Sequence, residues 1–448
     1  MTASPRRRRN RTIGAALAGV LVLVAAPLLG YAGWQVLKDS RAGTQVVTLD
    51  EIEFPSTPTA MLAVVDDDNV VVSLGVLVMA PSPATGVAAI GGTLVSIPTN
   101  SNTAQMLGSP AVPIADSIVN TGDSGLTGDL ESLTRVSIGF DAVLNAEELD
   151  ALLTRVGPIS ATLPNDVVTV NADGATETLF AAGERTLSPS EAASVLLARD
   201  PGQTESRRLP NVQAVWNGLS NAVGTGRAPA APLDTAIIDI NDFFDHFLAG
   251  PVQVFNDLTT TPVVADANPD DLDVGTMNVS SAVLLMASLA PSAMLTPNGG
   301  LSLRIENGLT QADIDAAGLV GVTPADVTRN VVDLVLFLTG DVVSVSASVF
   351  TPDPAVVPDE TAVYTSVELQ PVEQEDFAKV LGPVTFDEPR FVFPLVGAVI
   401  VIGHSYLAEM AAGQAAQTAT SDPDAAGEGA DTEITGISVV DPTDTVSS

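Results

Sequence analysis

The sequence predicts an α/β protein, a sandwich with a mixed central sheet followed by a smaller α/β domain, with one N-terminal transmembrane helix. Three observations lead to this prediction. Runs rich in Val, Ile and Leu alternate with amphipathic segments of helical period over most of the chain. A second alternation of the same kind begins at Gly300. Near the N-terminus, a group of arginines precedes a long uncharged apolar stretch.

The N-terminal stretch from Ile13 to Trp34 is 22 residues long and carries no charge. A helix of that length, at about 1.5 Å per residue, spans a hydrocarbon core of about 30 Å. We therefore predict a basic cytoplasmic segment at residues 1–12, a transmembrane signal anchor at 13–37 and a stalk at 38–54. The protein would then be a single-pass protein of the cytoplasmic membrane with its bulk outside. A cleaved signal peptide is the alternative, although its apolar part is usually only about 7–15 residues long.

The composition excludes several classes of function. Acidic residues outnumber Lys and Arg by 54 to 18, which gives a formal net charge of −36. Such a surface repels nucleic acid at long range, so no nucleic-acid partner is expected. The chain has no cysteine, which excludes disulfides, a thiol nucleophile and thiolate metal sites. Protein partners cannot be inferred from the composition.

The first alternation gives strands that end at turn-forming residues, followed mostly by helices. One helix begins with Ser188 as N-cap and Glu191 three residues later, the pattern of a capping box. Strands are predicted at Met61–Val65, 70–80, Gly92–Pro98 and Arg135–Phe140. Helices are predicted at Ala146–Gly157, Thr186–Asp200, Asn211–Val223, 237–250 and Val279–Leu289.

The second alternation gives a strand, a turn and a capped helix in Gly300–Gly318, a helix at 323–340 and a strand at 342–350. The apolar run Phe391–Gly403 is too short for a second membrane span and contains Pro394, so we predict a buried strand pair. After Ala411 the chain has seven acids and no base, which predicts a disordered acidic tail at 412–448.

Several segments occur in an order that resembles the LytR-CpsA-Psr (LCP) family of membrane-anchored envelope enzymes. They are SIP at Ser96–Pro98, the run Arg135–Asp166, and GERTLSPSEAASVLLARD at 183–200 followed by ESRRLPNVQ at 205–213. In the second alternation, LRIENGL and VIVIGHSYL resemble the LytR C-terminal domain of actinobacterial members. The chain thus resembles a divergent actinobacterial-type member. The resemblance implies a three-layer-like, LCP-like sandwich at 55–291 and a LytR C-terminal-like domain at 296–411.

The resemblance also implies an activity and the residues that would perform it. LCP enzymes transfer a glycopolymer from a polyprenyl pyrophosphate carrier to peptidoglycan, with arginines and aspartates around a divalent metal. Guanidinium groups bind pyrophosphate oxygens in bidentate pairs, and carboxylates hold Mg²⁺. Carried onto this chain, the phosphate-binding candidates are Arg199, Arg207, Arg208 and Gln213. Alternatively, these arginines lie in a solvated loop, where they pair with nearby acidic residues.

This chain departs from the family pattern at the other charged positions. Where the family has an arginine and an aspartate in one strand, the chain has Val71 and Ser73. Where the family has a second such pair after SIP, the chain has Thr99 and Asn100. In the last motif, Glu205 replaces an aspartate and Asn211 replaces the second arginine.

Two other groups of residues are weaker candidates. Asp66, Asp67 and Asp68 could bind Mg²⁺ or Ca²⁺ through clustered carboxylates, although three acids in a tight turn are more often simply solvated. His246 and His404 lie far apart in sequence, and neither is near a Ser or Cys in a nucleophile setting, which argues against a triad.

The sequence therefore predicts a membrane-anchored, extracytoplasmic LCP-like envelope protein that is catalytically degenerate and acts as a binding or scaffold module in cell-wall assembly. Polyprenyl-linked or cell-wall glycopolymers are the expected ligands, and no cofactor is expected. One alternative is an active phosphotransferase that uses Mg²⁺ and charged groups from elsewhere, such as Asp66–Asp68 and Arg135. The other is a structural envelope protein without a ligand.

Overall fold

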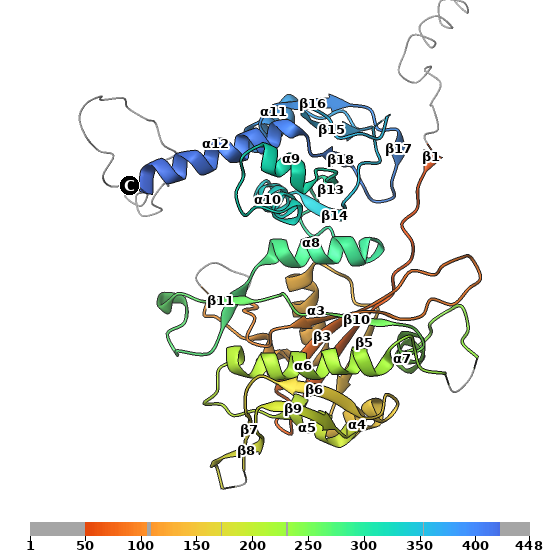
Figure 1. Cartoon of the computed structure of the whole chain (residues 1–448), viewed down its shortest axis with the longest axis vertical. Coiled ribbons are helices and arrows are strands. Elements are labelled where there is room, and N and C mark those ends of the chain that lie inside the picture. The colour runs from red at the N-terminus through yellow and green to blue at the C-terminus, as the bar shows by residue number, and fades with distance from the viewer. Residues whose placement is uncertain (1–49, 105–108, 172, 230–231, 353, 422–448) are drawn as a thin grey trace, which may run out of the picture. The chain divides into compact units, whose positions relative to one another are not determined.

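The computed structural model describes residues 50–104, 109–171, 173–229, 232–352 and 354–421 (Figure 1). The chain forms two compact units, residues 1–51 and 52–448. Of the first unit only β1 (Asp50–Glu51) is described, so the predicted anchor lies outside the described residues. Within the described ranges, no helix is both long and apolar enough to cross a membrane. The elements below belong to the second unit.

The first large sheet has five strands in the order β10-β4-β3-β2-β5. The outer pairs β10–β4 and β2–β5 are parallel, whereas β4–β3 and β3–β2 are antiparallel. The predicted mixed central sheet is therefore confirmed. Its strands are β2 (Thr59–Val65), β3 (Val71–Met79), β4 (Gly92–Ile97), β5 (Phe140–Leu144) and β10 (Val252–Phe255).

Helices cover both faces of this sheet, because its strands are apolar on both sides. Every residue of β2 and of β3 is buried. Leu74 and Val76 belong to one core, which includes residues of α3 and α8, whereas Leu77 and Met79 belong to another, which includes residues of α4 to α7. The arrangement is a three-layer sandwich. These helices are α3 (Asp123–Thr134), α4 (Ala146–Thr154), α5 (Pro189–Leu197), α6 (Glu205–Val223), α7 (Ile240–Leu248) and α8 (Val279–Leu289).

Shorter elements surround the sandwich. Three antiparallel pairs form hairpins or ribbons, β6–β9, β7–β8 and β11–β12. Their strands are β6 (Ile159–Leu163), β7 (Val167–Val170), β8 (Thr176–Phe180), β9 (Gly183–Leu187), β11 (Thr260–Pro262) and β12 (Gly275–Met277). The short helices are η1 (Ile114–Asp116), α2 (Ser117–Thr121), η2 (Ala265–Ala267) and η3 (Pro291–Ala293).

Two elements near the candidate site differ from the sequence prediction. The prediction of a strand at Arg135–Phe140 is wrong. Arg135 is the C-cap of α3, with a left-handed backbone conformation (φ 58°), and β5 begins only at Phe140. The helix predicted from Asn211 begins at Glu205 and contains Pro210. A proline in the second turn of this 19-residue helix removes one backbone N–H donor, yet the helix continues to Val223.

The second large sheet is also mixed, with the order β14-β13-β18-β15-β16. Its strands are β13 (Ser302–Glu306), β14 (Asp341–Ser346), β15 (Thr361–Thr365), β16 (Val384–Asp387) and β18 (Ala398–Val401). Its helices are α9 (Gln311–Ala316), α10 (Pro324–Phe337), α11 (Pro371–Leu381) and α12 (His404–Ser421). Helix α12 continues past residue 412, so the tail predicted at 412–448 starts too early, and its remainder lies outside the described residues.

The run Phe391–Gly403 is only partly the buried strand pair that the sequence predicts. Strand β18 is fully buried between β13 and β15. By contrast, β17 (Phe391–Val392) is a half-buried two-residue strand, and the chain then turns at Pro394. Leu395 follows with φ 63° and a side chain that is 66% exposed.

Helix α8 is shared by the two sheets. It packs against α3, α10 and β14. Its buried residues Ala282, Val283 and Met286 belong to one continuous apolar core that contains Val76 of the first sheet and Ile305 of the second.

Capping boxes start several helices and make the fold sensitive to acid. At α10, the hydroxyl of Thr323 donates to the carboxylate of Asp326 at 2.6 Å and chiefly for that reason the pKa of Asp326 lies below its ordinary value. A lowered pKa stabilises the fold above the ordinary carboxyl pKa, and this stabilisation is lost as the pH falls through the folded-state pKa.

We expect Asp326→Asn to be less stable than the parent chain at neutral pH and to lose less stability on acidification. The measurement is the melting temperature between about pH 7 and pH 2. Asp67→Asn, in an exposed turn, is the control and should leave the acid profile unchanged. Parallel profiles for Asp326→Asn and the parent would contradict the expectation.

Candidate functional site

A cavity of about 290 Å³ brings together two of the four phosphate-binding candidates. Arg199, from the segment between α5 and α6, and Arg208, in α6, both line it. The chain departs from the LCP pattern at Val71, Thr99 and Asn100, and these three residues line the same cavity. The structure thus brings Arg199 and Arg208 together with these three replaced positions.

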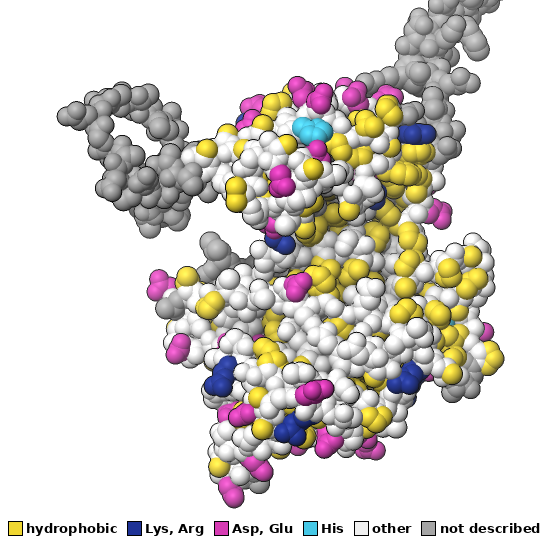
Figure 2. Space-filling model, viewed as in Figure 1, with side chains coloured by type: hydrophobic (Ala, Val, Ile, Leu, Met, Phe, Trp, Pro, Cys, Tyr) yellow, Lys and Arg dark blue, Asp and Glu magenta, His cyan; other side chains and the backbone are white. Residues whose placement is uncertain are grey.

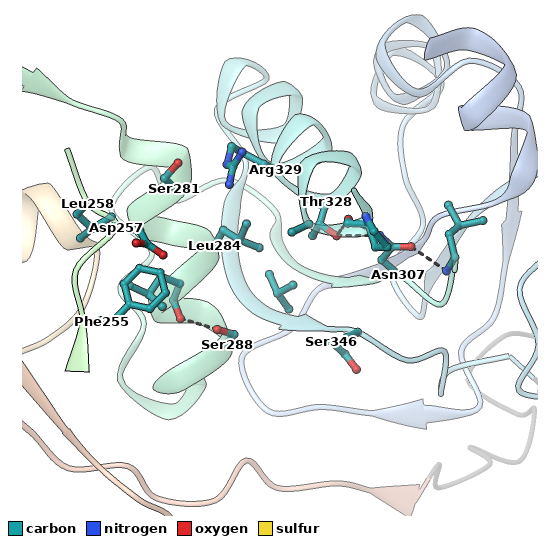
Figure 3. Close-up of a pocket in the computed structure, with 16 residues that line it drawn as sticks. Phe255, Asp257, Leu258, Ser281, Leu284, Ser288, Asn307, Thr328, Arg329 and Ser346 are labelled. Carbon is teal, nitrogen blue, oxygen red and sulfur yellow. Dashed lines mark hydrogen bonds between the residues drawn. The ribbon is translucent and has the colours of Figure 1, made fainter. Parts of the chain in front are cut away.

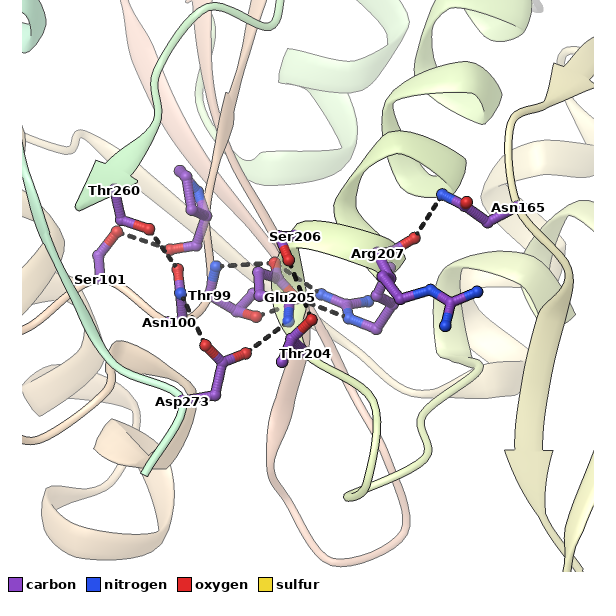
Figure 4. A network of polar contacts seen from close by, with 12 residues as sticks. Thr99, Asn100, Ser101, Asn165, Thr204, Glu205, Ser206, Arg207, Thr260 and Asp273 are labelled. Atoms are coloured by element: carbon purple, nitrogen blue, oxygen red, sulfur yellow. Dashed lines mark hydrogen bonds and ion pairs between the residues drawn. The ribbon is translucent and has the colours of Figure 1, made fainter. Parts of the chain in front are cut away.

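The other two candidates lie elsewhere. The side chain of Arg207 is exposed, and the backbone carbonyl of Arg207 accepts a hydrogen bond from Asn165 Nδ2 at 2.9 Å (Figure 4). Gln213 donates through Nε2 to the carbonyl of Asn256 at 3.0 Å. Neither residue lines the cavity, so the structure does not bring them together with Arg199 and Arg208.

Arg208 is held by a glutamate one helical turn before it. Its Nε donates to Glu205 Oε2 at 2.8 Å, and its Nη2 donates to Glu205 Oε1 at 3.0 Å. Nη2 also lies 3.2 Å from the hydroxyl of Thr99, whose backbone N–H donates to Glu205 Oε1 at 3.1 Å. Both charged side chains are nearly buried, at 9% exposed for Arg208 and 6% for Glu205. The guanidinium is therefore already in a bidentate pair with a carboxylate, and only Nη1 has no partner.

A second carboxylate occupies the N-terminus of α6. Asp273 Oδ2 accepts a hydrogen bond from the backbone N–H of Glu205, the first residue of the helix. Its Oδ1 accepts a hydrogen bond from Asn100 Nδ2 at 3.3 Å, and Asn100 in turn accepts one from the Thr260 hydroxyl at 3.1 Å (Figure 4). Helix N-termini attract anions through their free N–H groups and the helix dipole. Here a side chain of the same chain takes that position.

A third carboxylate faces Arg199. Asp66 Oδ2 lies 3.5 Å from Arg199 Nη1, and Asp66 Oδ1 accepts the backbone N–H groups of Asp68 and Val70. Both carboxylate oxygens of Asp66 are therefore engaged, one by Arg199 and the other by backbone N–H groups of its own turn. Asp67 and Asp68 are exposed. Throughout the described part of the chain, no three His, Asp or Glu side chains are grouped so that they could hold a metal ion. The metal site predicted at Asp66–Asp68 is therefore not assembled.

The cavity is acidic overall. Four carboxylates and two guanidinium groups line it, a formal charge of −2. The six residues are Asp116, Asp200, Glu205, Asp273, Arg199 and Arg208. A pyrophosphate group entering this cavity would meet more negative than positive charge, so its binding would require added cations.

Neither histidine belongs to this cavity. His246 is fully buried in α7, where its ring nitrogens lie 2.8 Å from the carbonyl oxygens of Asp242 and Asp234. His404 begins α12 and lies 3.7 Å from a carboxylate oxygen of Asp313.

A larger cavity of about 630 Å³ lies along α8 (Figure 3). Its lining is largely apolar, with Leu284 from α8 and Leu258 from the segment after β10. Among its polar groups, the side chain of Asn307 donates to Thr328 Oγ1 at 2.9 Å and to the carbonyl of Pro324 at 2.9 Å. These groups stabilise the fold locally, and the lining offers no nucleophile paired with a base.

The face of the central sheet beneath α6 is filled by large side chains. Trp216 and Leu94 are each 1% exposed, and Phe243 is completely buried. An open slot for a lipid tail would leave the side chains that line it accessible to solvent, which these three are not.

Sequence reasoning missed Asp273, Asp116 and Gln203 as cavity residues. Asp273 carries no local signal, because it lies in an irregular segment just before β12 and reaches α6 only through the fold. The pair of Glu205 and Arg208 does carry a signal, since residues three apart on a helix are neighbours. That spacing predicts the ion pair once α6 is known to begin at Glu205.

The fold and the site define an α/β sandwich protein with a small acidic cavity whose arginines are paired internally. No family model matches the chain, and no curated protein matches it. Among solved structures, the chain is similar in fold to LCP proteins, each matched over 51% of this chain. B. subtilis TagT is 14% identical with 86% of its chain covered and a TM-score of 0.35. The LytR-Csp2A-Psr enzyme from Actinomyces oris is 15% identical with 92% covered and a TM-score of 0.33.

A further match is TagT with bound octaprenyl pyrophosphate lipid, 12% identical, with 51% of this chain and 87% of that chain covered and a TM-score of 0.34.

Proposed function

We propose that the protein is a membrane-anchored, extracytoplasmic LCP-like module of the cell envelope that has lost phosphotransferase activity and serves in binding or scaffolding. The observation that carries the proposal is the internal pairing of the groups that would hold phosphate. Glu205 pairs with Arg208, Asp66 with Arg199, and Asp273 with the N-terminus of α6.

The replaced positions support the same conclusion. Val71 and Ser73, where the family pattern has an arginine and an aspartate, are each 1% exposed. The cavity that Val71 lines has a formal charge of −2. Removing charge-stabilising groups from a phosphoryl-transfer site costs on the order of 10³-fold in rate or more. Partial activity is therefore hard to sustain with this set of residues.

The test is transfer of a glycopolymer from a polyprenyl pyrophosphate carrier to peptidoglycan in the presence of Mg²⁺. We expect a rate on the order of 10³-fold or more below that of an active LCP enzyme assayed in parallel. Asp273→Asn, which removes a carboxylate from the α6 N-terminus, is a second protein to assay and should remain inactive. Magnesium-dependent transfer by the parent chain would overturn the proposal in favour of an active enzyme.

The alternative of an active phosphotransferase needs charged groups from elsewhere in the chain. Arg135, one of the residues it would use, does not line the cavity. Asp66 is engaged by Arg199 and by its own turn. A purely structural protein without a ligand is the other alternative. It would be favoured if neither cell-wall glycopolymer nor polyprenyl-linked sugar bound to the chain.

A further inference from the structure

The cavity of about 630 Å³ along α8 has the size of a ligand site, since pockets for small organic molecules measure roughly 300–1,000 Å³. Its floor is one face of α8, because Ser281, Leu284, Leu285 and Ser288 follow the i, i+3, i+4, i+7 spacing of a helix face. Its walls come from the end of β10, the segment after β13, α10 and the end of β14 (Figure 3). We call this cavity the α8 groove.

The middle of the α8 groove is apolar. Leu284 and Leu285 form its floor, and Phe255 and Val345 belong to its walls, all four of them half-buried. In Figure 2, hydrophobic side chains show at the surface over the part of the molecule that Figure 1 labels α8. Such a lining favours a ligand with an apolar body, because the apolar surfaces of both leave water on binding.

Several polar side chains of the α8 groove are already bonded within the chain. Asn307 donates to Thr328 Oγ1 at 2.9 Å. The hydroxyls of Ser288 and Ser346 each donate to a backbone carbonyl of their own segment, at 2.6 and 2.9 Å. An extended peptide brings an N–H and a C=O with every residue, and these would find few partners here. A hydrocarbon chain brings no such groups, so the lining favours an alkyl body over a peptide.

One polar side chain of the groove has donors to spare. Arg329 Nη1 donates to Asp326 Oδ1 at 2.8 Å, whereas Arg329 Nε is buried and has no hydrogen-bond partner. In Arg208 the corresponding edge is filled, since Nε and Nη2 both donate to the carboxylate of Glu205. Guanidinium groups bind carboxylates most strongly through such a pair of parallel N–H groups. The Nε edge of Arg329 is therefore suited to a carboxylate supplied by a ligand.

The charges of the groove favour a singly charged head group. Among the described residues that line it, Arg329 and Asp257 are the charged ones, which gives a formal charge of zero. Figure 3 shows Arg329 on the α10 side and Asp257 on the opposite side of α8. A carboxylate bound to Arg329 leaves a formal charge of −1 in the groove. A phosphate group, with about −1.5 to −2 charges, would leave more negative charge facing Asp257.

We propose that the α8 groove binds a fatty acid, with the carboxylate on the Nε edge of Arg329 and the alkyl chain along Leu284 and Leu285. The α8 groove is separate from the acidic cavity at α6, so the inference does not depend on the loss of phosphotransferase activity. Arg329 is 39% exposed, which leaves its guanidinium free to turn toward an entering carboxylate.

The test is photo-crosslinking of the full-length protein reconstituted in phosphatidylcholine vesicles. The probe is dodecanoate with a diazirine on its alkyl chain, and dodecanol with the same diazirine is the head-group control. Mass spectrometry of the digested protein locates the label. We expect dodecanoate to label residues 255–258 and 279–289 roughly tenfold or more above Val320, which is 86% exposed but does not line the groove.

Arg329→Gln should lower labelling of the groove by dodecanoate roughly tenfold or more, because it removes a charge-assisted pair of hydrogen bonds. Labelling by dodecanol should not change. Arg227→Gln, which removes an exposed arginine outside the groove, is the matched control and should change neither probe. Ser288→Trp, at an exposed position of the floor, should lower labelling by both probes because the indole fills the groove.

Equal dodecanoate labelling of the groove in Arg329→Gln and the parent chain would overturn the proposal. Label spread evenly between the groove and exposed apolar residues such as Val320 would overturn it as well. Dodecanol labelling reports whether the groove of Arg329→Gln is intact. If that labelling is also lost, Arg329→Lys decides, since lysine keeps the charge but not the planar pair of donors. Dodecanoate labelling that falls in Arg329→Lys while dodecanol labelling is kept supports the proposal, and dodecanoate labelling at the parent level contradicts it.

Discussion

Replacing Glu306 with alanine is expected to lower the free energy of unfolding by about 3–5 kcal/mol. Glu306 is completely buried in β13 and pairs with Arg304, whose Nε lies 2.8 Å from Glu306 Oε1. The other carboxylate oxygen accepts the backbone N–H groups of Phe350 and Thr351 at 2.7 and 2.9 Å. The alanine variant leaves a nearly buried guanidinium without its counter-ion and two backbone donors without an acceptor.

The measurement is chemical denaturation at neutral pH. Glu177→Ala, at an exposed position of β8, is the matched control and should change stability by less than about 0.5 kcal/mol. If Glu306→Ala were as stable as this control, the carboxylate would not be the group that holds the segment after β14 in place.

Removing Arg208 alone, as Arg208→Met, is also expected to cost about 3–5 kcal/mol. The variant leaves Glu205 charged and almost buried beside Asp273, with one of its oxygens bonded only to the N–H of Thr99. The double variant Glu205→Gln with Arg208→Met removes both charges, and we expect it to lose clearly less stability than the two single changes added together.

A double-mutant cycle built from denaturation curves measures this coupling. A coupling free energy near zero would mean that Arg208 is not committed to Glu205 and is free to hold a ligand. A large coupling would identify Arg208 as a structural residue. The same cycle on Arg155 and Asp245, a partly exposed pair, is the control, for which a coupling of about 1 kcal/mol or less is expected.

Local chemistry made much of the fold predictable from sequence. Ser188 and Glu191 predicted a capping box that the structure shows, because the signal lies within four residues. The β-branched runs of β2 and β3 and the helix at Val279–Leu289 were equally clear. The errors arose where a local rule was overridden. The helix was predicted from Asn211, but α6 begins at Glu205 and continues through Pro210.

The candidate site was only half predictable. Alignment to a family motif placed Arg199 and Arg208 correctly in one cavity, yet it could not show that their charges were already neutralised. For Arg208 the partner is Glu205, three residues away on the same helix. For Arg199 the partner is Asp66, 133 residues away in the sequence. Charges that cancel across such distances in sequence leave no local pattern.

The position of α8 has a consequence for how this protein can evolve. Because one helix contributes side chains to a core that reaches both sheets, neither half has a complete apolar interior without it. A gene that encoded only residues up to the end of α8 would leave Leu284 and Leu285 exposed where they now line a cavity with the second half. Recombination that exchanged only one half would therefore have to supply a matching face for α8.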